Sequence, residues 1–234
     1  MLKIEHLTKT YGEKKAVDDL SLHIHPGEIY GFIGHNGAGK TTTIKSVSGI
    51  LRFDSGEIYV NGKSIKTEPV ACKKQIAYIP DNPDLYEYMT GLQYLNFVSD
   101  IFGVSAADRK NRMEDLAEML EISSALAQPI SSLSHGMKQK IAIISAWIHD
   151  PKLIIMDEPF VGLDPKASHT LKQMMRGVCN QGGAIFFSTH VLEVAEKLCD
   201  KVAIISHGKL VRSGTMEDVK GDTSLESVFL ELEG

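Results

Sequence analysis

The sequence predicts an α/β fold that combines a mostly parallel sheet with an N-terminal antiparallel β layer and an inserted helical subdomain. Short alternating strands and turn pairs occupy residues 1 to about 65, and helical periodicity dominates between Thr90 and Ala127. From Leu153 onward, strands alternate with helices. A chain of 234 residues, 43% of them apolar, is long enough to bury the core of one compound domain.

The β layer is predicted from turn pairs that separate short strands. These pairs are Tyr11-Gly12, Pro26-Gly27 and Asn61-Gly62. Glycine in such a pair permits the tight reversal that joins antiparallel strands.

The helical subdomain is predicted from apolar residues at helical spacing. They are Leu92, Leu95, Phe97 and Val98, followed by Met113, Leu116, Ala117 and Leu120. Later in the chain, the predicted strands and helices are Leu153–Met156, Ala167–Cys179, Ala184–Phe187, Leu192–Leu198 and Val202–Ile205. We expect a single domain over residues 1–234. In it, about 1–88 and 150–234 form the core with its β layer, and about 89–149 form the helical subdomain.

A glycine-rich turn separates the apolar strand Ile29–Ile33 from a predicted helix. Its sequence, Gly34-His35-Asn36-Gly37-Ala38-Gly39-Lys40-Thr41, fits the P-loop pattern G-x-x-x-x-G-K-[ST], and Thr42 follows it. The glycines allow backbone N–H groups and a helix N-terminus to converge on a polyphosphate. Lys40 is predicted to contact the β- and γ-phosphates and Thr41 to bind Mg²⁺, so ATP and Mg²⁺ are the expected cofactors.

Two carboxylates follow a strand that is predicted to be buried. Leu153–Met156 is followed by Asp157, Glu158 and Pro159, as at the C-terminal end of a parallel strand that opens into an active site. Alone, this pattern would indicate an acidic turn. Together with a P-loop, it predicts that Asp157 holds the Mg²⁺ hydration shell and that Glu158 orients or deprotonates the attacking water.

A third apolar strand ends in polar side chains. Ala184–Phe187 is followed by Ser188, Thr189 and His190. A single histidine after a strand is most often a loop residue, but its place downstream of two phosphate motifs favours a catalytic role. His190 is therefore predicted to donate a hydrogen bond to the γ-phosphate.

The segment Leu133-Ser134-His135-Gly136-Met137-Lys138-Gln139-Lys140 precedes a predicted helix, Ile141 to His149, shortly before the two carboxylates. Ser134 alone would be an ordinary helix N-cap. In this order and spacing, the motifs resemble those of the ATP-binding cassette (ABC) family of ATPases along the whole chain. The resemblance implies a P-loop NTPase core, adenine stacking on Tyr11, a signature loop at Ser134 and Gly136, and a D-loop at Gly162-Leu163-Asp164-Pro165.

The resemblance also implies partners. In the family, two cassettes pack head to tail, so Ser134 and Gly136 would complete the nucleotide site of a second copy in a homodimer or heterodimer. A separate transmembrane permease would bind the pair on the cytoplasmic face of the cell membrane. The segment Pro80–Met89 would be the joint that meets this permease, although from its residues alone a plain interdomain linker is equally compatible.

Two segments depart from the usual family pattern. Asp81 stands where the family has a glutamine, and its carboxylate is predicted to bind Mg²⁺, with Asn82 as the alternative ligand. His135 and Met137 replace the commonest glycine and glutamine of the signature. This version of the signature and the tail Ser224–Leu232 resemble cassettes that serve exporter-like, ABC-2-type permeases, so export is expected.

Composition limits the other classes of function. Lys and Arg number 25 against 30 Asp and Glu, a net charge of −5, and no basic block is available to bind nucleic acid. The N-terminus lacks the pattern of a secretory signal, and the longest apolar stretch is far shorter than the ~20 residues that span a bilayer. The three cysteines, Cys72, Cys179 and Cys199, are widely spaced, which indicates reduced thiols.

Two other functions are compatible with the same motifs. A cassette protein acting on ribosomes or DNA typically carries two cassettes or a long inserted coiled coil, and neither is found in the sequence. A nucleotide sensor without turnover is disfavoured by Lys40, Asp157, Glu158 and His190, although Asp81 leaves it open.

Overall fold

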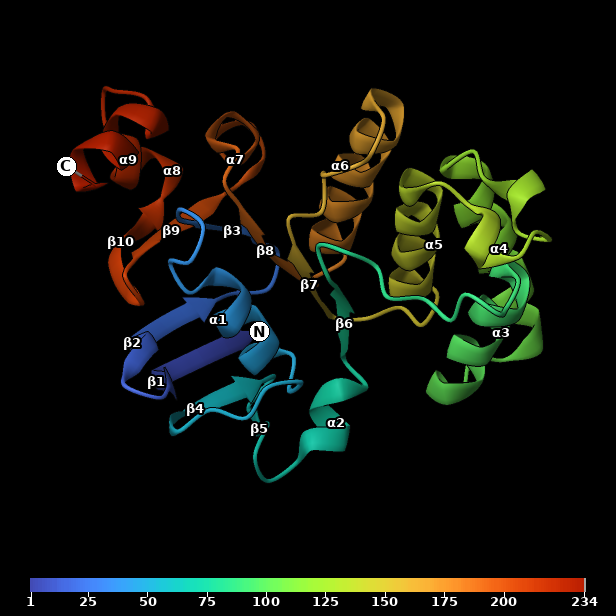
Figure 1. Cartoon of the computed structure of the whole chain (residues 1–234), viewed down its shortest axis with the longest axis horizontal. Helices are drawn as coiled ribbons and strands as arrows, with labels where there is room; N and C mark the ends of the chain where they lie inside the picture. Colours follow the sequence, from blue (N-terminus) through green and yellow to red (C-terminus); the bar gives the residue numbers. More distant parts are fainter. Residues whose placement is uncertain (234) are drawn as a thin grey trace.

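Two β-sheets with helices between and around them make up the computed structural model, which describes residues 1–233 (Figure 1). The first sheet is antiparallel, with strand order β2-β1-β4-β5. The second has the order β10-β9-β3-β8-β7-β6. The predicted combination of an antiparallel layer and a mostly parallel sheet is confirmed.

The strands are β1 Leu2–Tyr11, β2 Lys14–Ile24, β3 Ile29–Ile33, β4 Ser55–Val60, β5 Lys63–Ser64, β6 Ile76–Ile79, β7 Leu153–Asp157, β8 Ala184–Thr189, β9 Lys201–Ser206 and β10 Lys209–Thr215. The helices are α1 Lys40–Val47, α2 Pro69–Lys73, α3 Gly91–Phe102, α4 Ala106–Met119, α5 His135–Trp147, α6 Pro165–Asn180, α7 Leu192–Leu198, α8 Met216–Lys220 and α9 Leu225–Glu233, with short 3₁₀ turns at Ser123–Ala125 and Ile130–Ser132.

The central strands β3, β7 and β8 are buried along their whole length. Such continuously apolar strands are expected where helices cover both faces of a parallel sheet. Their parallel register places Ile29 beside Ile185 and Leu153 beside Ala184. The C-terminal ends of β3, β7 and β8 therefore meet at one edge of the sheet.

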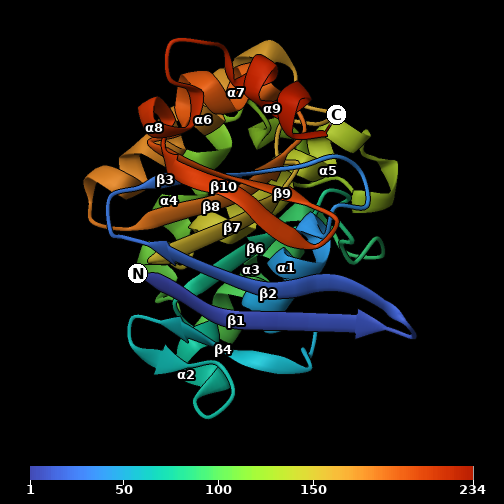
Figure 2. The same ribbon diagram turned by 90° about the vertical axis from the view of Figure 1, so that its left-hand side faces the viewer.

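Helix α1 lies between the two sheets, as Figure 2 shows. Its buried Ile44 belongs to the same apolar cluster as Leu7 of β1 and Phe32 of β3. This packing fixes the start of α1, and with it the P-loop, relative to both sheets.

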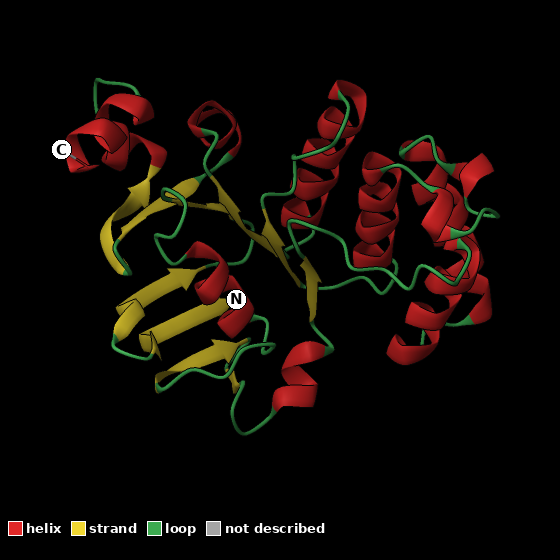
Figure 3. Cartoon of the chain, in the orientation of Figure 1, coloured by secondary structure: helices red, strands yellow, loops and turns green. Residues whose placement is uncertain are grey.

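Helices α3, α4 and α5 gather at one end of the molecule, beyond β6 (Figure 3). Ile141 and Ile144 of α5 share an apolar cluster with Leu95 of α3 and with Ile79 of β6. The helical subdomain is thus joined to the sheet through α5. No helix within residues 1–233 has the length and apolar character needed to cross a membrane.

Two details differ from the sequence prediction. Helix α5 begins at His135, not Ile141, because Ser134 caps its start: the Ser134 Oγ accepts a hydrogen bond from the Met137 N–H at 3.3 Å. The helix ends at Trp147, two residues before the predicted end at His149. The sheet also gains β10, which pairs antiparallel with β9. Its mostly exposed residues gave no apolar signal in the sequence.

Candidate active site

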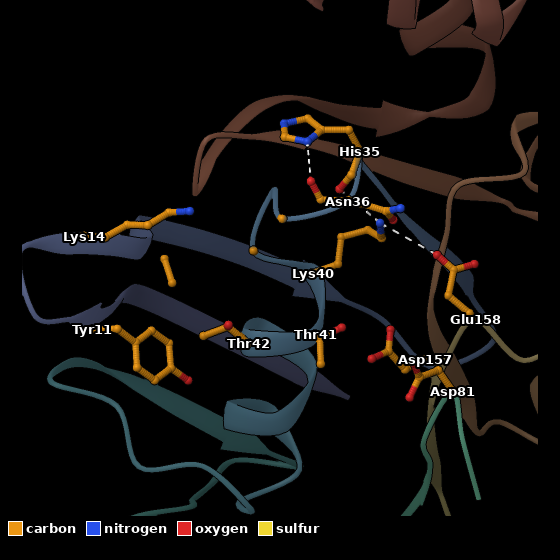
Figure 4. Close-up of a pocket in the computed structure, with 13 residues that line it drawn as sticks. Tyr11, Lys14, His35, Asn36, Lys40, Thr41, Thr42, Asp81, Asp157 and Glu158 are labelled. Carbon is orange, nitrogen blue, oxygen red and sulfur yellow. Dashed lines mark hydrogen bonds and ion pairs between the residues drawn. The ribbon is translucent and has the colours of Figure 1, made fainter.

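A cavity of about 400 Å³ lies between the β1–β2 hairpin, the P-loop and the ends of β6 and β7 (Figure 4). It is lined by Tyr11, Lys14, Ala16, His35, Asn36, Gly37, Gly39, Lys40, Thr41, Thr42, Asp81, Asp157 and Glu158. Most of the predicted nucleotide and metal residues are therefore brought together in one cavity. Gly34 and Ala38 are not part of this lining. The Gly34 carbonyl oxygen accepts a hydrogen bond from Lys40, and Ala38 is fully buried.

The P-loop geometry depends on glycine at position 39. Gly39 has a φ of 112°, which L-residues rarely adopt, and a Cβ there would lie 2.3 Å from the Ala16 carbonyl oxygen. The residue precedes the first turn of α1. Lys40, Thr41 and Thr42 of that turn line the cavity. Free N–H groups at such a helix N-terminus can bind an anion.

Lys40 is nearly buried at the base of the cavity, with 7% of its side chain exposed. Its ammonium group donates to the Gly34 carbonyl oxygen at 2.6 Å and to the His35 carbonyl oxygen at 3.3 Å. It also lies 3.7 Å from Oε1 of Glu158. The cation is thus held by the loop that would surround the phosphates, which fits its predicted role.

Asp157 supplies a carboxylate oxygen that fits a metal ion. The residue is 1% exposed, and its Oδ1 accepts a hydrogen bond from Ser188 Oγ. Its Oδ2 is buried and has no hydrogen-bond partner among the residues that the structure describes. An unpaired buried carboxylate oxygen is costly unless a cation lies beside it.

Thr41 and Asp81 line the same cavity and offer further oxygen atoms, the ligand type that Mg²⁺ prefers. We infer that Asp157, Thr41 and Asp81 would hold Mg²⁺, which would neutralise phosphate charge when bound. The alternative ligand, Asn82, does not line the cavity within the described chain. Its backbone N–H donates to Oδ1 of Asp81 at 2.8 Å.

Glu158 and His190 form a close pair at the end of β7 and β8. The Glu158 Oε1 atom is 2.9 Å from Nδ1 of His190, and the His190 backbone N–H donates to Oε2 at 3.3 Å. Glu158 has a φ of 48°, an uncommon conformation for a residue with a side chain. Its N–H donates to Ser188 Oγ at 3.1 Å, which anchors that turn. The carboxylate is thus oriented at the cavity, where it can accept a proton from water.

Tyr11 is exposed at the tip of the β1–β2 hairpin, where it can stack with a planar ring. The ammonium group of Lys9 lies 5.2 Å from the centroid of its ring. This cation–π contact holds the ring beside Lys9. Adenine stacking on Tyr11 stays a prediction.

The signature residues lie outside this cavity. Ser134 caps α5 in the helical subdomain, and Gly136 packs against Gly162, where a Cβ would lie 2.7 Å from the Gly162 carbonyl oxygen. The His135 ring also contacts Gly162, and Lys140 pairs with Asp164 at 3.0 Å. The signature and D-loop segments are therefore packed together within the chain. Their predicted contact with a second copy remains a prediction.

Sequence reasoning missed two residues that line the cavity. Lys14 and Ala16 do so from the β1–β2 hairpin. It also missed Tyr78 on β6, which lies outside the lining and has a buried hydroxyl without a partner in the described chain. Burial, with the charges of Asp157 and Asp81, raises the pKa of Tyr78. Its position shortly before Asp81 was the available sequence signal.

The comparisons with known proteins agree with this geometry. A family model described as ABC transporter matches residues 17–161. The ABC-type transporter ATP-binding protein EcsA of Bacillus subtilis is 34% identical over 99% of this chain and 96% of its own length. The Nod factor export ATP-binding protein I of Paraburkholderia xenovorans is 35% identical over 91% of this chain and 70% of its own.

A solved structure of an ATP-binding subunit of an ABC transporter superposes with a TM-score of 0.96 at 34% identity, covering 100% of both chains. Fold and site together define a P-loop ATPase cassette. The chain belongs to the ABC transporter family and is an ATP-binding and ATP-hydrolysing subunit of such a transporter.

Proposed function

We propose that this chain powers export as one half of a head-to-tail dimer of ATPase subunits, bound to a separate transmembrane permease on the cytoplasmic face of the membrane. In this proposal, Glu158 activates the attacking water, His190 donates to the γ-phosphate, and Lys40 neutralises the phosphates. ATP binding closes the dimer, and hydrolysis reopens it.

The observation that carries the proposal is the position of the signature loop. Ser134 is exposed at the N-terminus of α5, yet the chain's own nucleotide cavity is not lined by it or by Gly136 within the described residues. The free N–H groups of a helix N-terminus favour an anion. A γ-phosphate held by the P-loop of a second copy would supply that anion.

An exposed aromatic patch supports a protein partner at the joint. Tyr86 stacks on Tyr88 with ring centroids 5.8 Å apart and contacts Phe97 of α3 at 5.6 Å. Tyr88 is 80% exposed and Tyr86 is 45% exposed. Adjacent exposed aromatic rings are typical of interaction surfaces. We assign this patch, Tyr86, Tyr88 and Phe97, to the permease contact.

The signature loop also connects to this patch. The Ser131 N–H donates to the Glu87 carbonyl oxygen at 3.2 Å, and the Ile130 N–H donates to the Met89 carbonyl oxygen at 2.9 Å. A permease bound at Tyr86 and Tyr88 would therefore act on the segment that leads directly into Ser134.

Export is the direction that the relatives favour. The Paraburkholderia protein is named for Nod factor export, and the signature variant with Met137 is similar to that of exporter-like cassettes. The class of cargo is set mainly by the permease.

Co-purification tests the proposal. The chain is co-expressed with a candidate permease chosen from the genes next to its own, and the complex is isolated in detergent through a tag on that membrane protein. We expect the wild-type chain to be retained and the variant Tyr86→Ser/Tyr88→Ser to be lost. Val70→Ser, at an exposed apolar position on α2, is the control and should be retained. Equal retention of all three proteins would show that the patch is not part of the permease contact. If none of the three is retained, the proposal that the chain binds this permease is contradicted.

A further inference from the structure

Lys14 is a cavity residue that neither the P-loop motif nor the signature accounts for. It lies at the start of β2 and pairs in register with Tyr11 at the end of β1. Both residues line the nucleotide cavity. Figure 4 shows the Lys14 side chain extending from the hairpin toward the glycine turn of the P-loop, on the same side of the cavity as Tyr11.

The neighbouring lysines of the hairpin are neutralised by carboxylates. Lys9 pairs with Asp54 at 3.4 Å, and Lys15 pairs with Asp18 at 2.7 Å. Lys14, by contrast, has no ion pair or hydrogen bond of its side chain to any other residue in the described part of the chain. Its charge is available to a ligand in the cavity.

Charges are separated along the cavity. Asp81, Asp157 and Glu158 lie together at one end, beside Lys40, whereas Lys14 lies with Tyr11 at the other (Figure 4). A nucleotide whose base stacks on Tyr11 and whose terminal phosphates contact Lys40 places its sugar and α-phosphate between these residues. Of these two groups, only the α-phosphate carries a charge that attracts an ammonium group.

We propose that Lys14 binds the α-phosphate of the nucleotide, so that two lysines from separate elements divide the phosphate chain between them. The proposal rests on nucleotide binding in this cavity and extends it to a residue of the β1–β2 hairpin. Lys40 acts on the β- and γ-phosphates, and Lys14 acts on the phosphate that ATP, ADP and AMP share. Because Lys14 is exposed to solvent, its contribution is moderate and weakens as salt concentration rises.

Isothermal titration calorimetry at low ionic strength tests the proposal on the full chain. Three proteins are compared: the wild type, Lys14→Gln and Lys15→Gln. ATP and ADP are titrated directly into each protein, and the affinities of AMP and adenosine are measured by displacement of bound ADP. We expect Lys14→Gln to weaken ATP, ADP and AMP by similar factors, about three- to tenfold. Its affinity for adenosine should stay at the wild-type value.

Lys15→Gln is the matched control. It removes the same charge at the next residue, where the lysine is already paired with Asp18. It should bind every nucleotide as the wild type does. Lys14→Arg, which keeps the charge, should retain most of the affinity.

Two outcomes would overturn the assignment. Unchanged affinities in Lys14→Gln would show that the lysine does not touch the phosphate, and an equal loss for adenosine would place it on the base or sugar. In both cases Lys40→Ala should still lose ATP, so the nucleotide site itself would stand. A wild-type chain that fails to bind ATP would overturn both the site and the role of Lys14.

Discussion

The carboxylate of Glu158 lies 3.7 Å from the ammonium group of Lys40, at the base of the nucleotide cavity. The same Oε1 atom is 2.9 Å from Nδ1 of His190. One carboxylate oxygen therefore faces both the cation that would neutralise the phosphates and the imidazole that would contact the γ-phosphate. A bound phosphate must compete with Glu158 for Lys40, because both are anions.

This arrangement predicts opposite effects of Glu158→Gln on binding and turnover. The amide cannot accept a proton from water, so ATP hydrolysis should fall by about a hundredfold or more. ATP affinity should be retained or rise slightly, because a neutral amide no longer competes with the phosphates for Lys40. Phosphate release and calorimetric titration measure the two effects. A variant that hydrolyses ATP near the wild-type rate would remove Glu158 from the role of base.

The second prediction concerns how the ATPase activity of Asp81 variants depends on Mg²⁺ concentration. Asp81 lines the cavity beside Asp157, so Asp81→Ala should raise the Mg²⁺ concentration needed for half-maximal ATPase activity by several-fold, about the cost of one weak metal ligand. Asp81→Gln, which restores the common family residue, should stay close to the wild type. Asn82→Ala is the control, since Asn82 does not line the cavity within the described chain. If Asp81→Ala has the wild-type Mg²⁺ dependence, Asp81 is not a metal ligand.

His149 predicts how stability depends on pH. Its ring stacks on Phe102 with centroids 3.7 Å apart and lies 3.3 Å from the Ile76 carbonyl oxygen, so it joins the helical subdomain to β6. Burial lowers the pKa of His149 below its ordinary value of 6.5. The folded state therefore binds this proton less readily than the unfolded state. The stability from His149 is fully present above pH 6.5 and is lost as the pH falls from there toward the lower pKa of the folded state.

Urea unfolding at pH 7.5 and pH 5.5 checks this sign. The wild type should lose free energy of unfolding between the two pH values, and His149→Gln should lose less, because it has no proton to bind. His169→Gln, which changes an exposed histidine on α6, should behave as the wild type does. An equal loss in His149→Gln and the wild type would mean that His149 does not contribute to the pH dependence.

Local patterns in the sequence predicted the parts of the site that follow strands. The P-loop, Asp157 and Glu158 come directly after buried apolar runs, and the parallel register of β3, β7 and β8 brings them to one edge. Lys14 could not be predicted in this way, because its place in the cavity depends on how the hairpin packs over α1. The residues of α5 before Ile141 were left out of the predicted helix because they are mostly polar and give no apolar period.

The signature loop makes the last prediction. If Ser134 and Gly136 complete the site of a second copy, the Glu158→Gln protein should shift from monomer to dimer in ATP with Mg²⁺. It should remain monomeric in ADP, which lacks the γ-phosphate. Ser134→Arg in that background should prevent the shift by crowding the interface, while ATP binding to the monomer stays nearly intact. Light scattering measures the masses.

Ser105→Arg is the matched control for this experiment. Ser105 caps α4 in the same helical subdomain, as Ser134 caps α5, and its Oγ accepts from the Asp108 N–H at 3.1 Å. Loss of a cap costs both variants about 1 kcal/mol of stability, so only the position relative to the interface differs between them. Dimerisation should therefore survive Ser105→Arg and fail in Ser134→Arg. A dimer that forms equally in ADP, or that Ser134→Arg leaves unchanged, would mean that Ser134 serves only to cap α5.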